Sequence, residues 1–174
     1  MSYTLNIITA PADIYAAHSL LVLCGEHMHR TQSLDHWYPY RGLDIFTAEL
    51  EHAQATVYTI IDDSTQALIG TFYLSAVMRT WYASVQWQDA SHKAVYLGGF
   101  GILPIMQGRG VGTWAMNQID LLARDGGYDT LRFDGVASNP SLLRFYDKLN
   151  YIRRGLLDTP RGSQVMVYER VFGA

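Results

Sequence analysis

The sequence predicts an α+β fold, with a mixed, largely antiparallel twisted sheet of about seven strands around a central parallel β-α-β unit. Short segments rich in β-branched and aromatic residues recur along the chain, and segments with helical spacing of apolar residues lie between them. Their order is strands, then strand, helix, strand and helix, and then strands again. Because a helical crossover joins parallel neighbours, the two strands beside the middle helix are expected to run parallel.

Each expected strand is short and has turn-forming residues at its ends. The strand segments are Tyr3–Ile8, Thr56–Ile61, Leu68–Val77, Ala94–Leu103, Thr130–Val136, Tyr151–Leu157 and Gln164–Phe172. The polar run Asp62–Thr65 follows the second segment and predicts the turn of a hairpin. The fourth and fifth segments are the expected parallel pair.

Three segments have the spacing of apolar residues that is typical of a helix, and the last of them also has residues that mark its ends. The segments cover Pro11 to about Leu23, Val111–Arg124 and Pro140–Leu149. Asn139 is expected to cap the last helix, Pro140 to occupy its first position, and Asn150 to take the left-handed conformation after it. The segment His27–Ala53 is crowded with histidine and aromatic residues at few periodic apolar positions, so it is interpreted as loop or short helix.

Composition limits the classes of function. A chain of 174 residues is expected to form one domain, residues 1–174, and its net charge of −3 argues against nucleic acid as a partner. Cys24 is the only cysteine, which excludes an intramolecular disulfide. Met1–Ala10 lacks the pattern of a secretory signal, and no run approaches the roughly 20 apolar residues that span a bilayer. We therefore expect a cytoplasmic protein without a membrane contact.

A glycine-rich motif follows the expected fourth strand. Gln107-Gly108-Arg109-Gly110-Val111-Gly112 lies directly before a helix, where glycines let backbone N–H groups converge and the helix N-terminus adds partial positive charge. This arrangement predicts a pyrophosphate site, and the alternative is a structural strand-to-helix turn. The motif lacks the lysine of a P-loop and the spacing of a dinucleotide fold.

Together with Leu131–Asn139 and Leu143–Tyr151, this motif resembles the acetyl-CoA core of the GNAT superfamily of N-acetyltransferases, over residues 94–157. The resemblance implies a splayed fourth strand, helices on both faces of the sheet, and acetyl-CoA as cosubstrate. It also implies direct transfer of the acetyl group to a primary amine, for which a small molecule is the expected acceptor. The alternative is a module that binds or senses acetyl-CoA without turnover.

The resemblance also assigns roles to single residues. The backbone of Ile102 and Leu103 would pair with the pantetheine arm. Asn139 would reach a pantetheine amide, and Tyr146 would face the sulfur as the catalytic acid, unless it is only a core tyrosine. The residues that would contact the pyrophosphate are Gln107, Gly108, Arg109, Gly110, Val111, Gly112 and Thr113.

The chain departs from the family at the general base. Where many relatives carry an acid on the fourth strand, it has Gly98 and Gly99. Deprotonation of the amine would then pass through water held by Tyr96, His92 or a residue of the N-terminal segment, or the amine would bind in its neutral form.

Aromatic residues mark the expected acceptor region, in the segments His27–Tyr40 and Met78–His92. A site lined by aromatic side chains with few charges favours an amine with apolar or aromatic bulk over a polyamine. The acyl group could be acetyl or a slightly longer chain. The Trp81, Tyr82 and Trp87 cluster would alternatively cover the sheet or a homodimer partner. The histidines lack metal-ligand spacing, so no metal is expected. The expected acceptor contacts are His29, Trp37, Tyr38, Trp81 and Tyr96.

Overall fold

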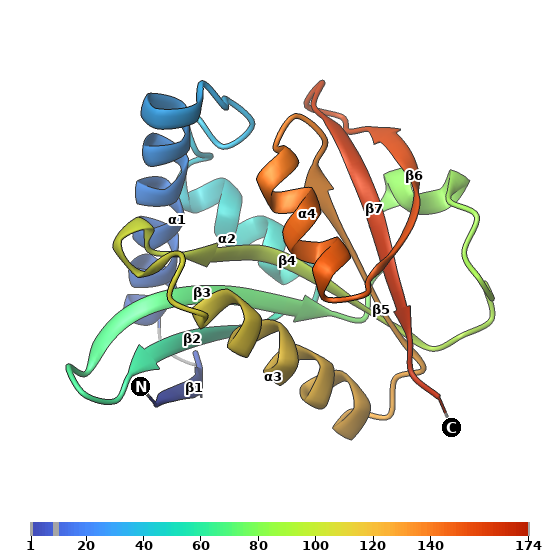
Figure 1. Ribbon diagram of the computed structural model, residues 1–174, viewed down its shortest axis with the longest axis horizontal. Coiled ribbons are helices and arrows are strands. Elements are labelled where there is room, and N and C mark those ends of the chain that lie inside the picture. Colours follow the sequence, from blue (N-terminus) through green and yellow to red (C-terminus); the bar gives the residue numbers. More distant parts are fainter. Residues whose placement is uncertain (1, 9–10, 174) are drawn as a thin grey trace. The chain divides into compact units, whose positions relative to one another are not determined.

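The computed structural model describes residues 2–8 and 11–173 (Figure 1). The chain forms two compact units, an N-terminal unit of residues 1–75 and 98–115 and a C-terminal unit of residues 76–97 and 116–174. Strand β4 (Ala94–Ile102) and helix α3 (Val111–Asp125) each contribute residues to both units. A single domain over residues 1–174 stays a prediction, and its residues 1, 9, 10 and 174 lie outside the described residues.

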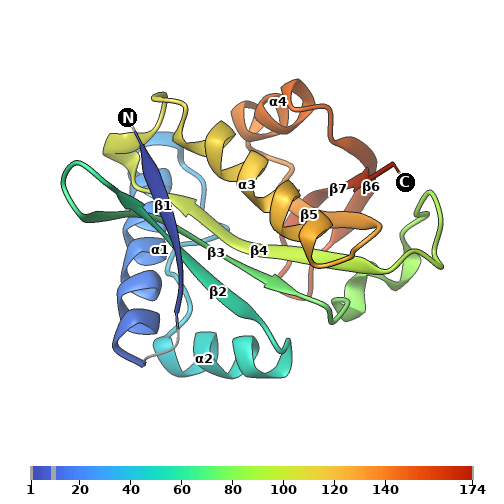
Figure 2. The ribbon, with the colours of Figure 1, turned by 90° about the horizontal axis from the view of Figure 1, so that it is seen from below.

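The N-terminal unit holds β1 (Tyr3–Ile7), β2 (Thr56–Asp62), β3 (Ala67–Ser75) and the later part of β4, in the order β1-β2-β3-β4. Figure 2 shows β1, β2 and β3 side by side, and both pairs are antiparallel. Asp62 accepts hydrogen bonds from the N–H and the hydroxyl of Ser64 at 2.9 and 2.6 Å. The predicted hairpin turn is therefore confirmed.

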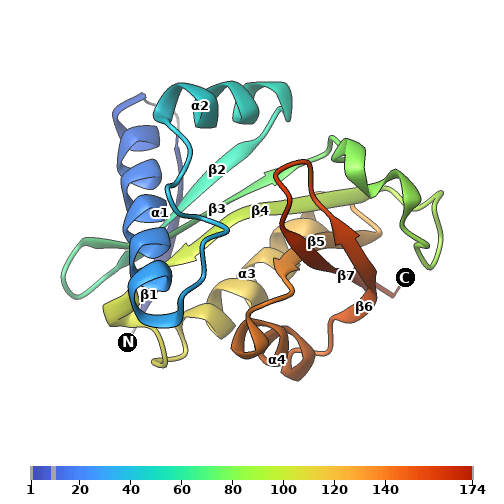
Figure 3. The same cartoon turned by 90° about the horizontal axis from the view of Figure 1, so that it is seen from above.

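Two helices complete this unit, α1 (Pro11–Gln32) and α2 (Leu43–His52) (Figure 3). The prediction that the first helix ends near Leu23 is wrong, because α1 continues through Gly25. A Cβ at Gly25 would lie 2.3 Å from the carbonyl oxygen of Trp37, so this glycine allows close approach of a neighbouring segment rather than ending the helix. Four good helix formers lie between it and the end of the helix: Glu26, Met28, Arg30 and Gln32.

The C-terminal unit holds the first part of β4, β5 (Thr130–Val136), β6 (Ile152–Asp158) and β7 (Gln164–Val171), in the order β4-β5-β7-β6. The pairing of β4 with β5 is parallel, from Ala94 opposite Thr130 to Tyr96 opposite Arg132, which confirms the predicted parallel pair. The β5–β7 and β6–β7 pairs are antiparallel. The predicted mixed, largely antiparallel α+β fold is thus confirmed.

Helix α4 (Pro140–Lys148) has the predicted ends. The Oδ1 atom of Asn139 accepts from the N–H of Leu142 at 3.0 Å, and Pro140 occupies the first turn. Asn150 has a φ of 61°, the left-handed conformation that ends the helix. Two 3-10 helices, η1 (Thr80–Ser84) and η2 (Pro104–Met106), flank β4 in the chain. No helix among the described residues is long and apolar enough to cross a membrane.

Candidate functional site

The glycine-rich loop of the N-terminal unit leaves a row of backbone N–H groups without acceptors. Gly108 and Gly110 have φ angles of 73° and 84°, a left-handed conformation that favours glycine. Trp114 is the first residue of α3 whose N–H has a recorded backbone acceptor. It donates to the carbonyl of Gly110 at 3.0 Å. Within the described chain, no backbone acceptor is recorded for the N–H groups of residues 108–113. They are therefore available to an anion at a helix N-terminus.

The loop is open at its two left-handed glycines. A Cβ at Gly108 or at Gly110 would meet no atom within 4 Å. The Arg109 side chain is exposed, and no described residue forms an ion pair or hydrogen bond with it. A cation beside unpaired N–H groups adds to the positive potential that a pyrophosphate requires.

The end of β4 is held in place before the loop begins. The carbonyl of Ile102 accepts from the Gln107 side-chain amide at 3.1 Å and from the Cys24 thiol at 3.4 Å. Leu103 donates its N–H to Ile69 and accepts at its carbonyl from Met106. Both backbone groups of Leu103 are thus engaged, whereas the N–H of Ile102 points away from β3, because successive residues of a strand point to opposite sides. Of the two residues, Ile102 is the one with an N–H suited to pair with a ligand.

Tyr146 lies on the face of α4 that packs against β5. Its ring is 4.7 Å from that of Phe133, and the residue is only 4% exposed. No hydrogen bond from its hydroxyl to any described residue is recorded. Burial raises the pKa of Tyr146 well above its usual value, and the charge of Asp134 raises it further. The hydroxyl therefore stays protonated at neutral pH and is free to donate.

The side chain of Asn139 can cap α4 and bind a ligand at the same time. Its Oδ1 atom is the helix cap. Its Nδ2 group has no recorded partner in the part of the chain that the structure describes. The cap fixes the side chain and leaves the amide N–H₂ as the group that could donate to a ligand.

A partly buried polar cluster, which no motif in the sequence indicates, joins the segment before β4 to β5. The hydroxyl of Tyr82 and the guanidinium of Arg79 both donate to Oδ2 of Asp134, at 2.5 and 2.6 Å. Arg79 also donates to the carbonyl of Leu97 at 3.4 Å. Burial raises the pKa of Tyr82 well above its usual value, which keeps this hydroxyl a donor. The only signal in the sequence is a polar residue at each of these positions.

The expected acceptor contacts of the N-terminal unit fall into two groups. His29 and Tyr38 stack with ring centroids 3.9 Å apart, and His29 bonds through Nδ1 to Asp35 at 2.6 Å. Trp37 instead packs against the core cluster formed by α1, α2 and β2, with its ring 5.6 Å from that of Tyr40. The stacked pair is thus accessible, whereas Trp37 packs against the core, and an acceptor contact of these residues stays a prediction.

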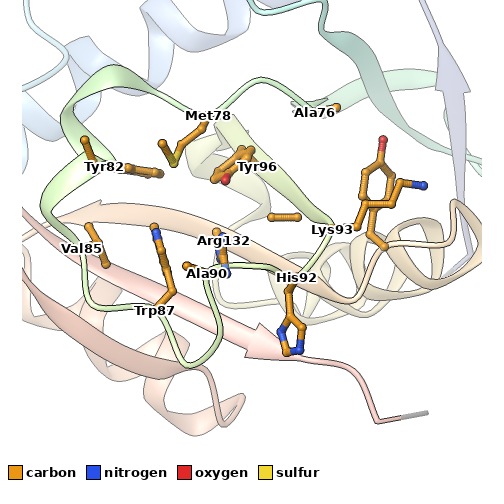
Figure 4. Close-up of a pocket in the computed structure, with 13 residues that line it drawn as sticks. Ala76, Met78, Tyr82, Val85, Trp87, Ala90, His92, Lys93, Tyr96 and Arg132 are labelled. Carbon is orange, nitrogen blue, oxygen red and sulfur yellow. The ribbon is translucent and has the colours of Figure 1, made fainter.

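The C-terminal unit contains a pocket of about 490 Å³ beside the first part of β4 (Figure 4). Tyr96, whose contact with the acceptor stays a prediction, lines it together with Tyr82 and Trp87 from the preceding segment. Trp81 packs against the same aromatic cluster but is not among the lining residues. Among residues 2–8 and 11–173, no group of three or more His, Cys, Asp or Glu side chains could hold a metal ion.

Comparison with known proteins places this geometry in a family. The sequence profile of the acetyltransferase (GNAT) family matches residues 15–151. No curated protein sequence matches the chain. A GNAT-family acetyltransferase from Streptococcus agalactiae has a similar structure, with a TM-score of 0.78, 16% identity, and coverage of 99% of this chain and 96% of that one.

Two further solved structures share the fold. One is a chimera of spermidine N-acetyltransferase from Vibrio cholerae, with a TM-score of 0.69, 16% identity, and coverage of 98% of this chain and 96% of that one. The other is the ribosomal-protein-S18-alanine N-acetyltransferase from Escherichia coli, with a TM-score of 0.70, 13% identity, and coverage of 99% and 96%. At these identities the structures show a common fold, and their acceptors are properties of those proteins.

Proposed function

The chain belongs to the GNAT family of acetyltransferases and is an acyltransferase enzyme, and from this premise we propose that it transfers the acetyl group of acetyl-CoA to a primary amine of a small molecule. The observation that carries the choice of donor is the glycine-rich loop. Its unpaired N–H groups, the start of α3 and the exposed Arg109 together suit the pyrophosphate of coenzyme A. In this proposal Gln107 fixes the strand end, and residues 108–113 bind the phosphates.

Binding of the rest of the donor is proposed residue by residue. Ile102 would donate its backbone N–H to the pantetheine arm, and Asn139 would donate its side-chain amide to a pantetheine carbonyl. Leu103 would support Ile102 through its bonds to Ile69 and Met106 rather than bind directly. Tyr146 would donate its hydroxyl proton toward the sulfur as the thiolate leaves.

The proposed reaction is a direct attack of the amine on the thioester carbonyl, without a covalent enzyme intermediate. Cys24 is an unsuitable nucleophile, since it is 4% exposed and burial raises the pKa of its thiol to about 12. Gly98 and Gly99 provide no carboxylate, so the amine would reach the site in its neutral form or lose its proton through water. Tyr96 and His92, which both line the pocket, are the proposed groups to hold such a water.

The proposed acceptor is an amine with apolar or aromatic bulk. Support comes from the aromatic lining of the pocket in the C-terminal unit and from the stacked His29 and Tyr38 in the N-terminal unit. No Asp or Glu is among the residues that line the pocket, which disfavours a polycation such as spermidine. We further propose that residues 1–174 act as one domain in the cytoplasm, consistent with a single, buried, free cysteine.

An acceptor screen that measures release of free CoA tests this proposal. Small aromatic and aliphatic amines, polyamines and a basic peptide would be compared at equal concentration, with acetyl-CoA and propionyl-CoA as donors. We expect the highest kcat/KM with acetyl-CoA and an aromatic amine. Preference for a polycation would refute the proposed acceptor class, and CoA binding without turnover of any amine would indicate a sensing module instead.

A further inference from the structure

The pocket of the C-terminal unit has aromatic walls that are held rigidly. Tyr82 is fully buried and packs edge-on against Trp87, with ring centroids 5.7 Å apart. Tyr96 lies 6.0 Å from Tyr82, and the guanidinium of Arg132 covers the face of Trp87 at 4.3 Å. Figure 4 shows these side chains around one opening. A volume of about 490 Å³ between such walls suits a small flat ring.

Several polar groups of the lining have no recorded partner among the described residues. They are the indole N–H of Trp87, the hydroxyl of Tyr96 and Nδ1 of His92, of which the last is buried. Arg132 donates through Nε to Glu169 at 3.0 Å and through Nη2 to the carbonyl of Asp89 at 2.8 Å, which leaves Nη1 without a recorded acceptor. The indole of Trp87 and the guanidinium of Arg132 can only donate, so these two groups call for a ligand that accepts hydrogen bonds, whereas the Tyr96 hydroxyl and the His92 ring can donate or accept.

The charged residues around the pocket also favour a ligand that accepts hydrogen bonds. Glu169 is fully buried and pairs with both Arg132 at 3.0 Å and Arg154 at 2.6 Å, so one carboxylate faces two cations. Lys93 and His92 also line the pocket, whereas no Asp or Glu does. The Nε2 atom of His92 lies 3.7 Å from Asp89, whose carboxylate is bonded to Ser91. The surroundings therefore favour an anion over a cation.

We propose that this pocket is a binding site for a small aromatic carboxylate. The ring would lie between Trp87 and Tyr96, and the carboxylate would accept from the indole N–H of Trp87 and from Arg132. This site shares no residue with those proposed for acetyl-CoA, and its occupation does not depend on acetyl transfer. The carboxylate would belong either to the amine acceptor itself or to a separate ligand, and the two sources are distinguished below.

Nuclear magnetic resonance of the indole N–H groups tests the site directly. The chain has 4 tryptophans, so four indole signals are expected, and the one lost in Trp87→Phe identifies Trp87. Benzoate, titrated without acetyl-CoA or amine, should shift the Trp87 signal in a saturable way. Benzylamine has the same ring without the carboxylate and should shift this signal only at a much higher concentration. Equal binding of the two compounds, or no shift of the Trp87 signal with benzoate, would overturn the proposal.

Variants test the role of Trp87, and competition kinetics show whether the carboxylate belongs to the acceptor or to a separate ligand. By calorimetry, Trp87→Phe should weaken benzoate binding by about tenfold, because it keeps a ring and removes one hydrogen bond to a charged group. Trp114→Phe is the matched control on α3 and should bind benzoate like the unmodified protein. In the acetylation assay, benzoate that competes with the amine identifies the carboxylate as part of the acceptor. Benzoate that binds without competing identifies a separate ligand, and failure of the assay itself leaves the titration unaffected.

Discussion

The hydroxyl of Tyr82 donates to Oδ2 of Asp134 at 2.5 Å, and this bond connects the 3-10 helix η1 to strand β5 across the C-terminal unit. Arg79 donates to the same oxygen at 2.6 Å, so one carboxylate oxygen fixes two side chains of the segment before β4. Tyr82 lines the pocket and packs against Trp87, which also lines it, so the cluster supports two aromatic side chains of the lining. Its loss should affect both stability and binding at the pocket.

Tyr82→Phe should lower the free energy of unfolding by about 1 to 3 kcal/mol, because it removes a buried donor and leaves Asp134 with one partner fewer. Urea unfolding measures the change. Tyr128→Phe is the matched control, since no hydrogen bond of its hydroxyl is recorded, and it should change stability by less than about 0.5 kcal/mol. Similar losses in the two variants would show that the bond to Asp134 adds little.

Gly110→Asp should abolish or strongly weaken CoA binding, because a carboxylate there would repel the pyrophosphate and obstruct the N–H groups of the loop. Gly162→Asp is a close control: Gly110 and Gly162 have φ angles of 84° and 80°, and a Cβ at either meets no atom within 4 Å. Both variants should therefore lose a similar 1 to 2 kcal/mol or so of stability from backbone strain. Calorimetry should show CoA affinity lost in Gly110→Asp alone, and equal affinity in both would exclude the loop as the CoA site.

Tyr146→Phe should lower kcat by on the order of 10²-fold with CoA affinity little changed, if the hydroxyl acts as the acid. No bond from the hydroxyl to a described residue is recorded, so its removal should leave stability nearly unchanged. Tyr151→Phe offers the contrast, because its hydroxyl donates to Asp120 at 2.9 Å and its loss should reduce stability. Full kcat in Tyr146→Phe, under conditions in which chemistry limits the rate, would identify Tyr146 as a core residue only.

The value of kcat/KM should rise with pH toward the pKa of the acceptor amine, because β4 carries no carboxylate that could remove the proton of the amine. Burial raises the pKa of Tyr146, so its active protonated form persists through pH 7 to 9 and causes no falling limb there. The observation that would contradict a neutral amine is a plateau set by a group with a pKa near 6 to 7. If His92→Ala removed that plateau, His92 would be the base.

Cys24 should resist alkylation in the folded protein at pH 8 and react only after unfolding. Its thiol donates to the carbonyl of Ile102, and burial raises its pKa from 9.0 to about 12. Because the folded form holds the proton more tightly, the thiol stabilises the fold fully below pH 9, and this contribution is lost as the pH rises from 9 toward 12. Cys24→Ala should keep acetyl transfer, whereas loss of transfer in a folded variant would argue against direct attack.

The sequence was most informative where structure is local. The cap at Asn139, the left-handed Asn150 and the turn at Asp62 depend on neighbouring residues, and all three were predicted. The prediction that the first helix ends near Leu23 was wrong, and the role of Gly25 in that helix depends on the carbonyl of Trp37 in another segment. Arg79 and Asp134 are 55 positions apart, so nothing in a single sequence pairs them. Such contacts between distant residues can be identified only from the three-dimensional arrangement of the strands.

The bond from Cys24 to Ile102 also makes the chain a convenient host for chemical labels. Since the only thiol is buried and protonated, a cysteine introduced at an exposed position would be the only one open to a maleimide dye or a nitroxide. Fluorescence or spin-resonance measurements could then begin from the natural sequence plus one substitution, with no cysteine to remove first.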